Sequence, residues 1–428
     1  MSLLAIGLLL LALVVVGIPI AIALGIAAVA AMLTGPDGVG SLPNTALVMF
    51  DGATSFPLIA IPLFILAGAI MNASGISRRL IAFASAVVGF IRGGLSMVTI
   101  SASLFFAEIS GSAVADVAAL GSILIPAMRE KGYSKAFAAA VTSSSATLAV
   151  IIPPSIPMII YGVMSGSSIV ELFVAGIVPG VLGGGLMMLV AYFLARKHDF
   201  PREQEFQLGR VWRTFRDAGW ALTLPLIILG GIFSGWVTAT EGAGLAVVAS
   251  VLIGGLVYRE LDLALLKRAM LEGGQQTAVV MLLVAASALL GDYLTEVRVP
   301  QQVAEGIMGM TQDKWTILLL LNVFFLGIGL FLHSAAAIIL VVPVVMPLVQ
   351  AAGIDPVHFG LIVTLNLGIG QQTPPVASVL VTACSVAKAD VWEVSKVNLW
   401  FIGVLVSMLL LVTYVPIVPM ALVELFYR

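Results

Sequence analysis

Two proline-interrupted stretches carry the clearest chemical potential in this 428-residue chain: AVIIPPSIP at 149–157 and GQQTPP at 370–375. Proline has no N–H and clashes with the preceding turn, which costs about 3 kcal/mol in a helix interior. Each stretch therefore predicts a broken helix whose carbonyls lack their helical donors. Such carbonyls can replace the hydration shell of Na⁺, and helix N-termini attract anions. The two breaks thus predict an ion and substrate cradle.

Small hydroxyl residues also lie at two sites in the chain that are expected to face the breaks. Ser110 and Ser112 occur in ISGSA (109–113), and Ser334 follows His333 in LHSA (332–335). Glycine and serine in an apolar segment are also typical of close helix packing, and that alternative stays open. Opposite a matching proline break, the hydroxyls favour ion binding.

Other polar residues within the apolar runs are open to two interpretations. Ser145 and neighbouring hydroxyls precede the first break, and Asn366 is the matching residue before the second. Back-bonding of Ser and Thr to their own helix is the alternative to substrate binding. Asp116 lies four residues beyond Ser112, and an ionisable group at membrane depth is a functional hypothesis by default. Glu241 in TATEGAG is expected mainly to cap a helix.

The composition excludes a soluble protein. Hydrophobic residues make up 61% of the chain and charged residues 10%, with a mean hydropathy of +1.15, whereas soluble domains are about 25% charged. Cys384 is the single cysteine, so a disulfide framework or a cysteine metal site is excluded. The chain is therefore expected to be an all-α polytopic membrane protein. Apolar runs fall at about 56–73, 94–130, 136–163, 169–195, 218–236, 240–258, 273–295, 315–352, 358–384 and 397–425, besides a run at 2–33 that GIP (17–19) divides.

The basic residues give the topology. All but three of the 20 Lys and Arg residues can be placed in the cytoplasm, the exceptions being Arg298, Lys314 and Arg428. Arg92 and Arg129 then flank segment 94–130 on the same side of the membrane. This segment is expected to be a re-entrant hairpin, and 315–352 a second one that enters from the opposite face.

An internal repeat relates the two halves. Shifting the chain by 221 residues aligns 112–155 with 333–376 without a gap, and matches Pro126 with Pro347, Gly132 with Gly353, Pro153 with Pro374 and Pro154 with Pro375. Chance in an apolar background is the alternative, but three matched prolines and a glycine argue against it. Inverted repeats with interrupted helices at matching positions point to a secondary transporter with a midplane site.

The expected organisation has about ten membrane-spanning helices plus two hairpins. The first repeat, 1–195, and the second, 218–428, are joined by a cytoplasmic linker at 196–217. Within them the scaffold helices occupy 2–73 and 218–295, the arms 77–92 and 300–313, the hairpins 94–130 and 315–352, and the broken helices 136–163 and 358–384. The unit formed by 94–195 and 315–428 is expected to move against the scaffold.

Five stretches together resemble the large membrane (permease) subunit of tripartite ATP-independent periplasmic (TRAP) transporters: LFILAGAIMNASGISRRL (63–80), ISGSAVADVAALGSILIPAMREKGY (109–133), IIPPSIPMIIYG (151–162), TATEGAG (238–244) and GIDPVHFGLIVTLNLGIGQQTPPVAS (353–378). The resemblance covers essentially the whole chain. It implies a Na⁺-driven elevator-type importer of organic acids, such as C4-dicarboxylates or sialic acid, in the bacterial inner membrane. It also implies two partners, a small four-helix membrane subunit and a periplasmic substrate-binding protein, and no nucleic acid.

The resemblance also implies the sodium ligands. The first site would comprise Ser110, Ser112, Ala149, Ile152 and Pro154, and the second Ser334, Gly370, Gln371 and Thr373. Candidate substrate ligands at the presumed midplane are Ser145, Asn366, Gln372 and Asp116. The chain departs from the family in having Gln371, Gln372 and His333 at its second site, so the two sites need not be equivalent. TATEGA also lacks the proline of the corresponding family element.

Three alternatives to this function differ in class. A stand-alone Na⁺/dicarboxylate symporter with similar hairpins would need no delivery protein. An intramembrane enzyme is disfavoured because the three histidines (His198, His333 and His358) are widely separated and no HExxH occurs. A channel is disfavoured because closed hairpins and broken helices fit alternating access better than a continuous pore.

Overall fold

The computed structural model describes residues 3–35, 38–110, 112–203, 205–374 and 376–428. All regular secondary structure in these ranges is helical, as the composition predicts. In the first half the helices are α1 (Leu3–Val15), α2 (Ile20–Leu33), α3 (Thr45–Ala53), α4 (Ala60–Ala73), α5 (Ile76–Val88), α6 (Gly94–Ser110), α7 (Ala113–Glu130), α8 (Lys135–Thr147), α9 (Ile156–Ser165) and α10 (Ile169–Lys197).

The second half continues with ten further α-helices. They are α11 (Leu208–Phe233), α12 (Ala239–Leu252), α13 (Leu263–Glu296), α14 (Val299–Met310), α15 (Lys314–Gly329), α16 (Ser334–Ala351), α17 (Pro356–Gly370), α18 (Ser378–Ala387), α19 (Val391–Tyr414) and α20 (Ile417–Tyr427). A 3₁₀ turn at Leu148–Val150 follows α8 directly.

Seven helices in the described part of the chain are long and apolar enough to cross a bilayer. Eight shorter apolar segments of 10–17 residues accompany them, among them Gly94–Ala107, Ile156–Ser165 and Ser378–Ala387. At a rise of about 1.5 Å per residue, a ten-residue helix covers only about half of a bilayer core. Prolines and glycines divide several other apolar runs into shorter helices, and the number of about ten spans stays a prediction.

Part of the expected linker at 196–217 is helical. Helix α10 continues to Lys197 and α11 begins at Leu208, so 198–207 are the residues between the two helices. The start of α11 is basic and amphipathic: Arg210, Arg213 and Arg216 recur every three residues and are exposed. Such a segment is stable as a helix at a membrane surface although its composition is that of a loop.

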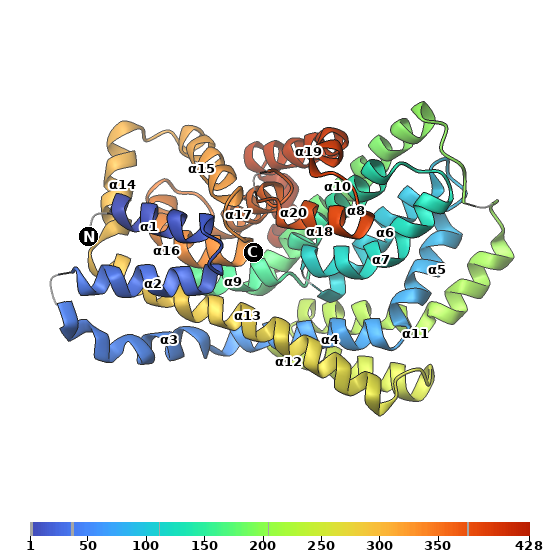
Figure 1. The fold of residues 1–428 in the computed structure, drawn as a ribbon, viewed down its shortest axis with the longest axis horizontal. Coiled ribbons are helices and arrows are strands. Elements are labelled where there is room, and N and C mark those ends of the chain that lie inside the picture. Colours follow the sequence, from blue (N-terminus) through green and yellow to red (C-terminus); the bar gives the residue numbers. More distant parts are fainter. Residues whose placement is uncertain (1–2, 36–37, 111, 204, 375) are drawn as a thin grey trace.

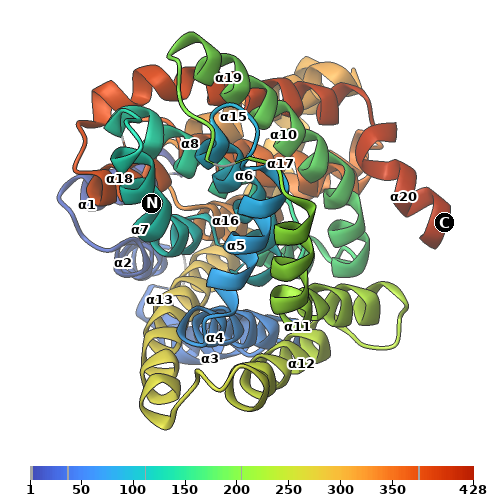
Figure 2. The same ribbon diagram turned by 90° about the vertical axis from the view of Figure 1, so that its right-hand side faces the viewer.

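The helices form two groups that lie against each other (Figures 1 and 2). One group contains α2, α3, α4, α11, α12 and α13, with α13 packed along α2, α3 and α4, and α12 along α4 and α11. The other group contains α6–α10 and α15–α20. Helix α5 packs on both α11 and α6, and α14 on both α13 and α16, so each of these two helices bridges the groups.

The second group contains two sets of four helices with matching contacts. Helix α6 packs on α7 and α8, just as α15 packs on α16 and α17. Helix α7, the second arm of the first hairpin, also contacts α18, the helix that follows the second break. Helix α16, the second arm of the second hairpin, likewise contacts α9, the helix that follows the first break. Two segments more than 200 residues apart thereby adopt the same packing and interlock at the centre.

Candidate functional site

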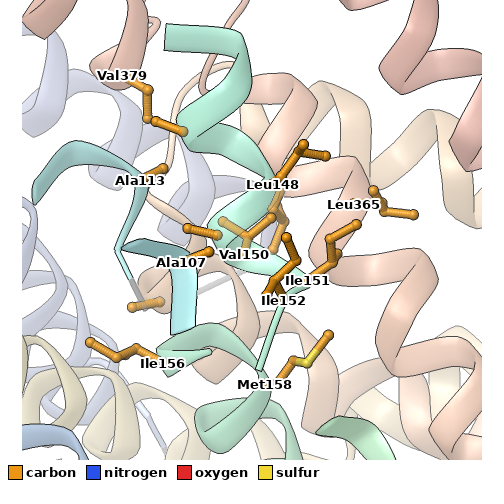
Figure 3. Packing of buried hydrophobic residues seen from close by; sticks show 14 of the residues in the cluster. Ala107, Ala113, Leu148, Val150, Ile151, Ile152, Ile156, Met158, Leu365 and Val379 are labelled. Carbon is orange, nitrogen blue, oxygen red and sulfur yellow. The ribbon is translucent and has the colours of Figure 1, made fainter. Parts of the chain in front are cut away.

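The first helix break lies entirely inside the protein. Helix α8 ends at Thr147, and α9 begins only at Ile156. Every residue from 148 to 161 is buried (Figure 3). Because residues 153, 154 and 157 are prolines, the carbonyls of Ala149, Val150 and Pro153 have no N–H four residues ahead to accept from. This interior segment thus concentrates backbone oxygens that a continuous helix would have paired.

Local hydrogen bonds fix the shape of this break. The Leu148 carbonyl accepts from the backbone N–H groups of Ile151 and Ile152, both at 3.0 Å. Ser155 donates its hydroxyl to the Val150 carbonyl at 2.6 Å and caps α9 by accepting from the Met158 N–H. Of the three carbonyls that lack helical donors, that of Val150 is therefore satisfied by a side chain within the break.

Helix α10 supports the break from behind through glycines. A Cβ atom built on Gly176 would lie 1.9 Å from the Ile151 carbonyl oxygen, and one on Gly180 would lie 2.5 Å from the Ile152 side chain. Real Cβ atoms do not approach other atoms so closely, so only glycine allows α10 to touch the broken backbone. The glycines of α10 are therefore part of the site's construction.

The tip of the first hairpin lies next to the break. Helices α6 and α7 both contact the 148–150 turn, and Ala107 and Ala113 lie beside Val150 in Figure 3. Ser112 occupies the N-cap position of α7 with an extended backbone. Ser110 is the last residue of α6, but its side chain lies outside the part of the structure that is described. The backbone thus places the predicted first tip where the sequence expects it, opposite its own break.

The second break is contacted by the second hairpin, just as the first break is contacted by the first hairpin. Helix α17 ends at Gly370 and α18 begins at Ser378. A Cβ atom on Gly370 would lie 2.4 Å from the carbonyl carbon of Gly329, the last residue of α15. The end of the second hairpin's first arm therefore rests directly on the second break. Ser334, which begins α16, is also buried.

Gln371 and Thr373 continue the second break with internal hydrogen bonds. The Gln371 carbonyl accepts from the Val379 N–H at 3.3 Å, and the Thr373 hydroxyl donates to the Ile369 carbonyl at 3.0 Å. Gln371 is 3% exposed, and among the described residues its side-chain amide makes two long contacts of 3.5 Å, to the Leu367 carbonyl and the Ser378 hydroxyl. The side chain of Gln371 is thus weakly held for a buried amide.

The two breaks touch each other at the centre of the molecule. A Cβ atom on Gly368 would lie 2.9 Å from the Val150 side chain and 3.0 Å from that of Thr147. Gln372 of the second break donates to the Ser143 carbonyl at 2.8 Å and also to the Thr147 hydroxyl. One side chain therefore ties the second break to the helix that leads into the first.

Buried hydrogen bonds extend from this centre to α19. The Gln372 side-chain oxygen accepts from the Asn398 amide at 3.1 Å, and the Asn398 oxygen accepts from the Ser144 hydroxyl. Ser145 and Ser103 of α6 share a hydrogen bond of 2.9 Å between their hydroxyls. All five side chains have exposed fractions of 0%. Paired polar groups of this kind fix which faces of the helices meet.

A second polar cluster holds α17 to its other neighbours. Asn366 donates to the Asn322 side-chain oxygen of α15 at 2.6 Å and to the Ile362 carbonyl at 2.8 Å. Asn322 in turn donates to the Thr413 hydroxyl of α19 at 3.2 Å. The Asn366 oxygen is buried and has no hydrogen-bond partner among the described residues. A buried acceptor of this kind is costly unless another group uses it.

The candidate substrate ligands thus have structural partners of their own. Ser145, Asn366 and Gln372 are completely buried, and each already donates a hydrogen bond within or between helices. Asp116, also completely buried, lies in the first turn of α7, where the helix dipole stabilises a carboxylate. Their role as ligands stays a prediction.

Two residues of uncertain role have capping functions. Glu241 and Thr238 form a capping box at the start of α12: Thr238 accepts from the Glu241 N–H, and Glu241 accepts from the Thr238 N–H at 2.8 Å. The expectation that Glu241 caps a helix is confirmed. His333 is the N-cap residue of α16 and accepts from the Ala335 N–H at 3.4 Å.

Sequence reasoning missed Asn322, Asn398 and Thr413, which complete the buried polar clusters. Their signal was present: two asparagines stand in otherwise apolar helical runs, where an unpaired amide is expensive. The supporting glycines Gly176 and Gly329 were missed for a different reason. Glycine is common in membrane helices, so its type alone does not single it out.

The donor chemistry at both breaks suits a hard cation. Backbone carbonyls, hydroxyls and side-chain amide oxygens are oxygen donors, and hard cations prefer oxygen ligands. In the described parts of the chain, no three His, Cys, Asp or Glu side chains come together as a possible metal site. The residues of the breaks therefore fit Na⁺ better than a transition metal.

Comparisons with known proteins give a consistent result. The sequence model of the family described as "Tripartite ATP-independent periplasmic transporter, DctM component" matches residues 7–418. An isethionate TRAP transporter permease protein, DctMQ, of Oleidesulfovibrio alaskensis is 43% identical over 409 residues, which are 95% of this chain and 64% of that protein. The C4-dicarboxylate TRAP transporter large permease protein DctM of Pseudomonas aeruginosa is 39% identical over 391 residues and 91% of each chain.

Among solved structures, the YdaH transporter of Alcanivorax borkumensis is similar to this chain. The TM-score is 0.65, with 16% sequence identity over 89% of each chain. At that identity the likeness concerns the fold alone. The fold of this chain is therefore one found in a membrane transporter.

Proposed function

The chain belongs to the DctM family of tripartite ATP-independent periplasmic transporters, and from this premise we propose that it imports a small organic acid with a Na⁺ gradient. It is a transporter permease and not an enzyme, and it is a multi-pass protein of the bacterial inner membrane. The coupling ion, the cargo and the elevator motion are the proposed part. The family resemblance of the sequence and the geometry of the two breaks support them.

One observation carries the proposal: two broken helices, each backed by its own hairpin end, meet in the buried centre of the chain. Helices α6, α8, α15 and α17 end there, and α7, α9, α16 and α18 begin there. Helix C-termini carry partial negative charge and N-termini partial positive charge. The same centre thus offers carbonyl ends to a cation and N–H ends to a carboxylate.

The proposed sodium sites lie between each hairpin tip and its break. The first would use Ser110, Ser112 and the backbone near Ala149, Ile152 and Pro154, and the second Ser334, Gly370, Gln371 and Thr373. The weakly bonded Gln371 amide would be free to reorient toward an ion. Sodium binding would fix the backbone of each tip and thereby raise the affinity for the anion between the tips.

The cargo is proposed to be a small organic anion. The two relatives above are named for isethionate and for C4-dicarboxylates, both small anions, and sialic acid is a further organic acid transported within the family. The Asn366 oxygen is buried without a partner in the described structure and is an acceptor, so it would pair with a hydroxyl of the cargo or with a cation rather than with the anionic group itself. Ser145, Gln372 and Asp116 complete the proposed set of substrate ligands.

The matching contacts of the two sets support an inverted repeat and an elevator-type motion. Helices α5 and α14 occupy equivalent bridging places between the two groups of helices. They are proposed to brace a transport unit, α6–α10 with α15–α20, against a scaffold of α1–α4 and α11–α13. A small membrane subunit and a periplasmic substrate-binding protein are the proposed partners.

The second candidate is a stand-alone Na⁺/dicarboxylate symporter, because hairpins and broken helices that meet in the interior would serve it equally well. Uptake of radiolabelled organic acids into proteoliposomes separates the two. The vesicles contain this chain and its small partner, with or without an inward Na⁺ gradient and with or without the cognate binding protein. Uptake that needs both supports the proposal. Uptake with Na⁺ alone favours the symporter, and uptake without Na⁺ contradicts both.

A further inference from the structure

A basic pocket lies at the junction of α5, α6 and α10, away from the two breaks. It has a volume of about 480 Å³ and is lined by Phe90, Ile91, Arg92, Tyr192, Arg196 and Arg202. Volumes of roughly 300–1,000 Å³ are typical of small-molecule sites. Three arginines and two aromatic residues thus line the pocket, and guanidinium groups are suited to phosphate recognition.

The backbone fixes this pocket. The linker that follows α10 is fastened to the α5–α6 turn by two hydrogen bonds, from the Gly93 N–H to the Pro201 carbonyl at 3.2 Å and from the Glu203 N–H to the Gly89 carbonyl at 3.0 Å. Arg202 lies between these two anchored positions of the linker. Gly93 also packs so tightly on Ala195 of α10 that a Cβ there would lie 2.4 Å from the Ala195 methyl. The three arginines therefore come from one rigid junction.

The positive charge of the pocket is only partly compensated. Asp199 pairs with Arg92 at 3.3 Å, and its side chain is 86% exposed. Among the residues that the structure describes, neither Arg196 nor Arg202 forms an ion pair. Both lie on the cytoplasmic side by the distribution of basic residues. Two guanidiniums thus remain available at the level of the lipid headgroups.

An apolar stripe leads to the pocket along α10. Leu182, Leu186, Leu189 and Phe193 are each 39–59% exposed and recur every three or four residues, so they share one face of the helix. Arg196 follows Phe193 by three residues and continues the same face. A lipid whose phosphate contacts Arg196 would lay an acyl chain along this stripe. This continuity distinguishes a lipid from a free phosphate or another soluble anion.

We propose that this pocket binds the phosphate of an anionic phospholipid of the cytoplasmic leaflet, with an acyl chain along the exposed face of α10. Basic pockets between membrane helices on the cytoplasmic side suit anionic headgroups. A lipid bound here would touch the turn between α5 and α6, the end of α10 and the linker that follows it. It would therefore hold the α5–α6 turn to the end of α10.

The test measures lipid binding to the purified full-length chain by native mass spectrometry and by thermal shift. The probes are phosphatidylglycerol, phosphatidylcholine and inorganic phosphate. The pocket variant is Arg196→Ala with Arg202→Ala, and the matched control is Arg210→Ala with Arg213→Ala, two exposed arginines outside the pocket on α11. Unchanged melting in phosphatidylcholine establishes that each variant is folded. A second pocket variant, Arg196→Lys with Arg202→Lys, keeps the charge should the alanine pair misfold.

We expect phosphatidylglycerol to bind the wild type in preference to phosphatidylcholine, and the pocket variant to bind it about 25-fold more weakly, at about fivefold per arginine. The control should keep wild-type binding, and the lysine pair should lie between. Three results would overturn the proposal: equal binding by the pocket variant and wild type, an equal loss in the control, or a pocket-dependent shift with inorganic phosphate alone.

Discussion

The substitution Gly176→Ala places a methyl group where the structure has a carbonyl oxygen. The new Cβ would lie 1.9 Å from the Ile151 oxygen, about 1.5 Å closer than the 3.4 Å at which ordinary contacts begin. It would also lie 3.0 Å from the end of the Met158 side chain, which can move aside. The backbone of the break cannot move without displacing its carbonyls. Helix α10 or the break must therefore shift.

The magnitude follows from two opposing effects. Overpacking a tight contact costs about 1–3 kcal/mol, while alanine is favoured over glycine in a helix by about 1 kcal/mol. The net cost is thus about 0–2 kcal/mol, and the overlap with a backbone oxygen places it at the upper end. If about 2 kcal/mol falls on the ion-loaded geometry of the break, the Na⁺ concentration for half-maximal uptake rises by about 30-fold.

The assay is Na⁺-dependent uptake in proteoliposomes, with Gly185→Ala as the matched control. Gly185 lies in the same helix, and a Cβ atom there would meet nothing within 4 Å. The control should therefore keep the wild-type Na⁺ dependence and equal or exceed its thermal stability. Wild-type Na⁺ dependence in Gly176→Ala would refute the claim that α10 sets the shape of the break.

Three other predictions concern Gln372, Glu260 and the proposed first sodium site. Gln372→Leu leaves the Asn398 amide without its acceptor. The melting temperature in detergent should therefore fall, by an amount equivalent to about 1–3 kcal/mol of stability. The control Gln350→Leu, on the exposed face of α16, should melt as the wild type does. The hydrogen bond and charge of Arg79 lower the pKa of Glu260 below its ordinary 4.5. The Glu260 carboxylate is therefore ionised and paired at neutral pH. The ion pair is lost as Glu260 becomes protonated at a pH below about 4.5. Glu260→Gln should therefore be less stable than the wild type at pH 7, by about 0.2–1 kcal/mol, and the difference should shrink as the pH falls below 4.5 through the lowered pKa of Glu260; a difference that stays constant into acid would contradict the ion-pair account. Ser110→Ala combined with Ser112→Ala should raise the Na⁺ concentration for half-maximal uptake, and an unchanged value would remove both residues from the first sodium site.

The helix breaks could be predicted from the sequence because proline acts locally. The prolines of 153–157 prevent a helix whatever surrounds them, and α8 and α9 indeed stop short of one another at 148–155. The same holds for the gap between α17 and α18. The tip between α6 and α7 could be placed because basic residues at both ends of 94–130 require the chain to turn back.

The partners of the buried amides could not be predicted in this way. Asn398 lies 254 residues after Ser144, and their hydrogen bond depends on which face α19 turns toward α8. A sequence with uniformly apolar helices gives little information on rotation about a helix axis. The early start of α11 was missed because charged residues suggested a loop, although their spacing also suits a surface helix.

The most direct test of the central claim is the thermal stability of the purified chain titrated with Na⁺ and, at equal ionic strength, with K⁺. A ligand that binds only the folded state stabilises it by RT ln(1 + [L]/Kd), so the melting temperature rises with the concentration of the ligand. The account predicts stabilisation by Na⁺ but not by K⁺, reduced when Ser110 and Ser112 are replaced by alanine. Equal melting curves in Na⁺ and K⁺ would contradict it.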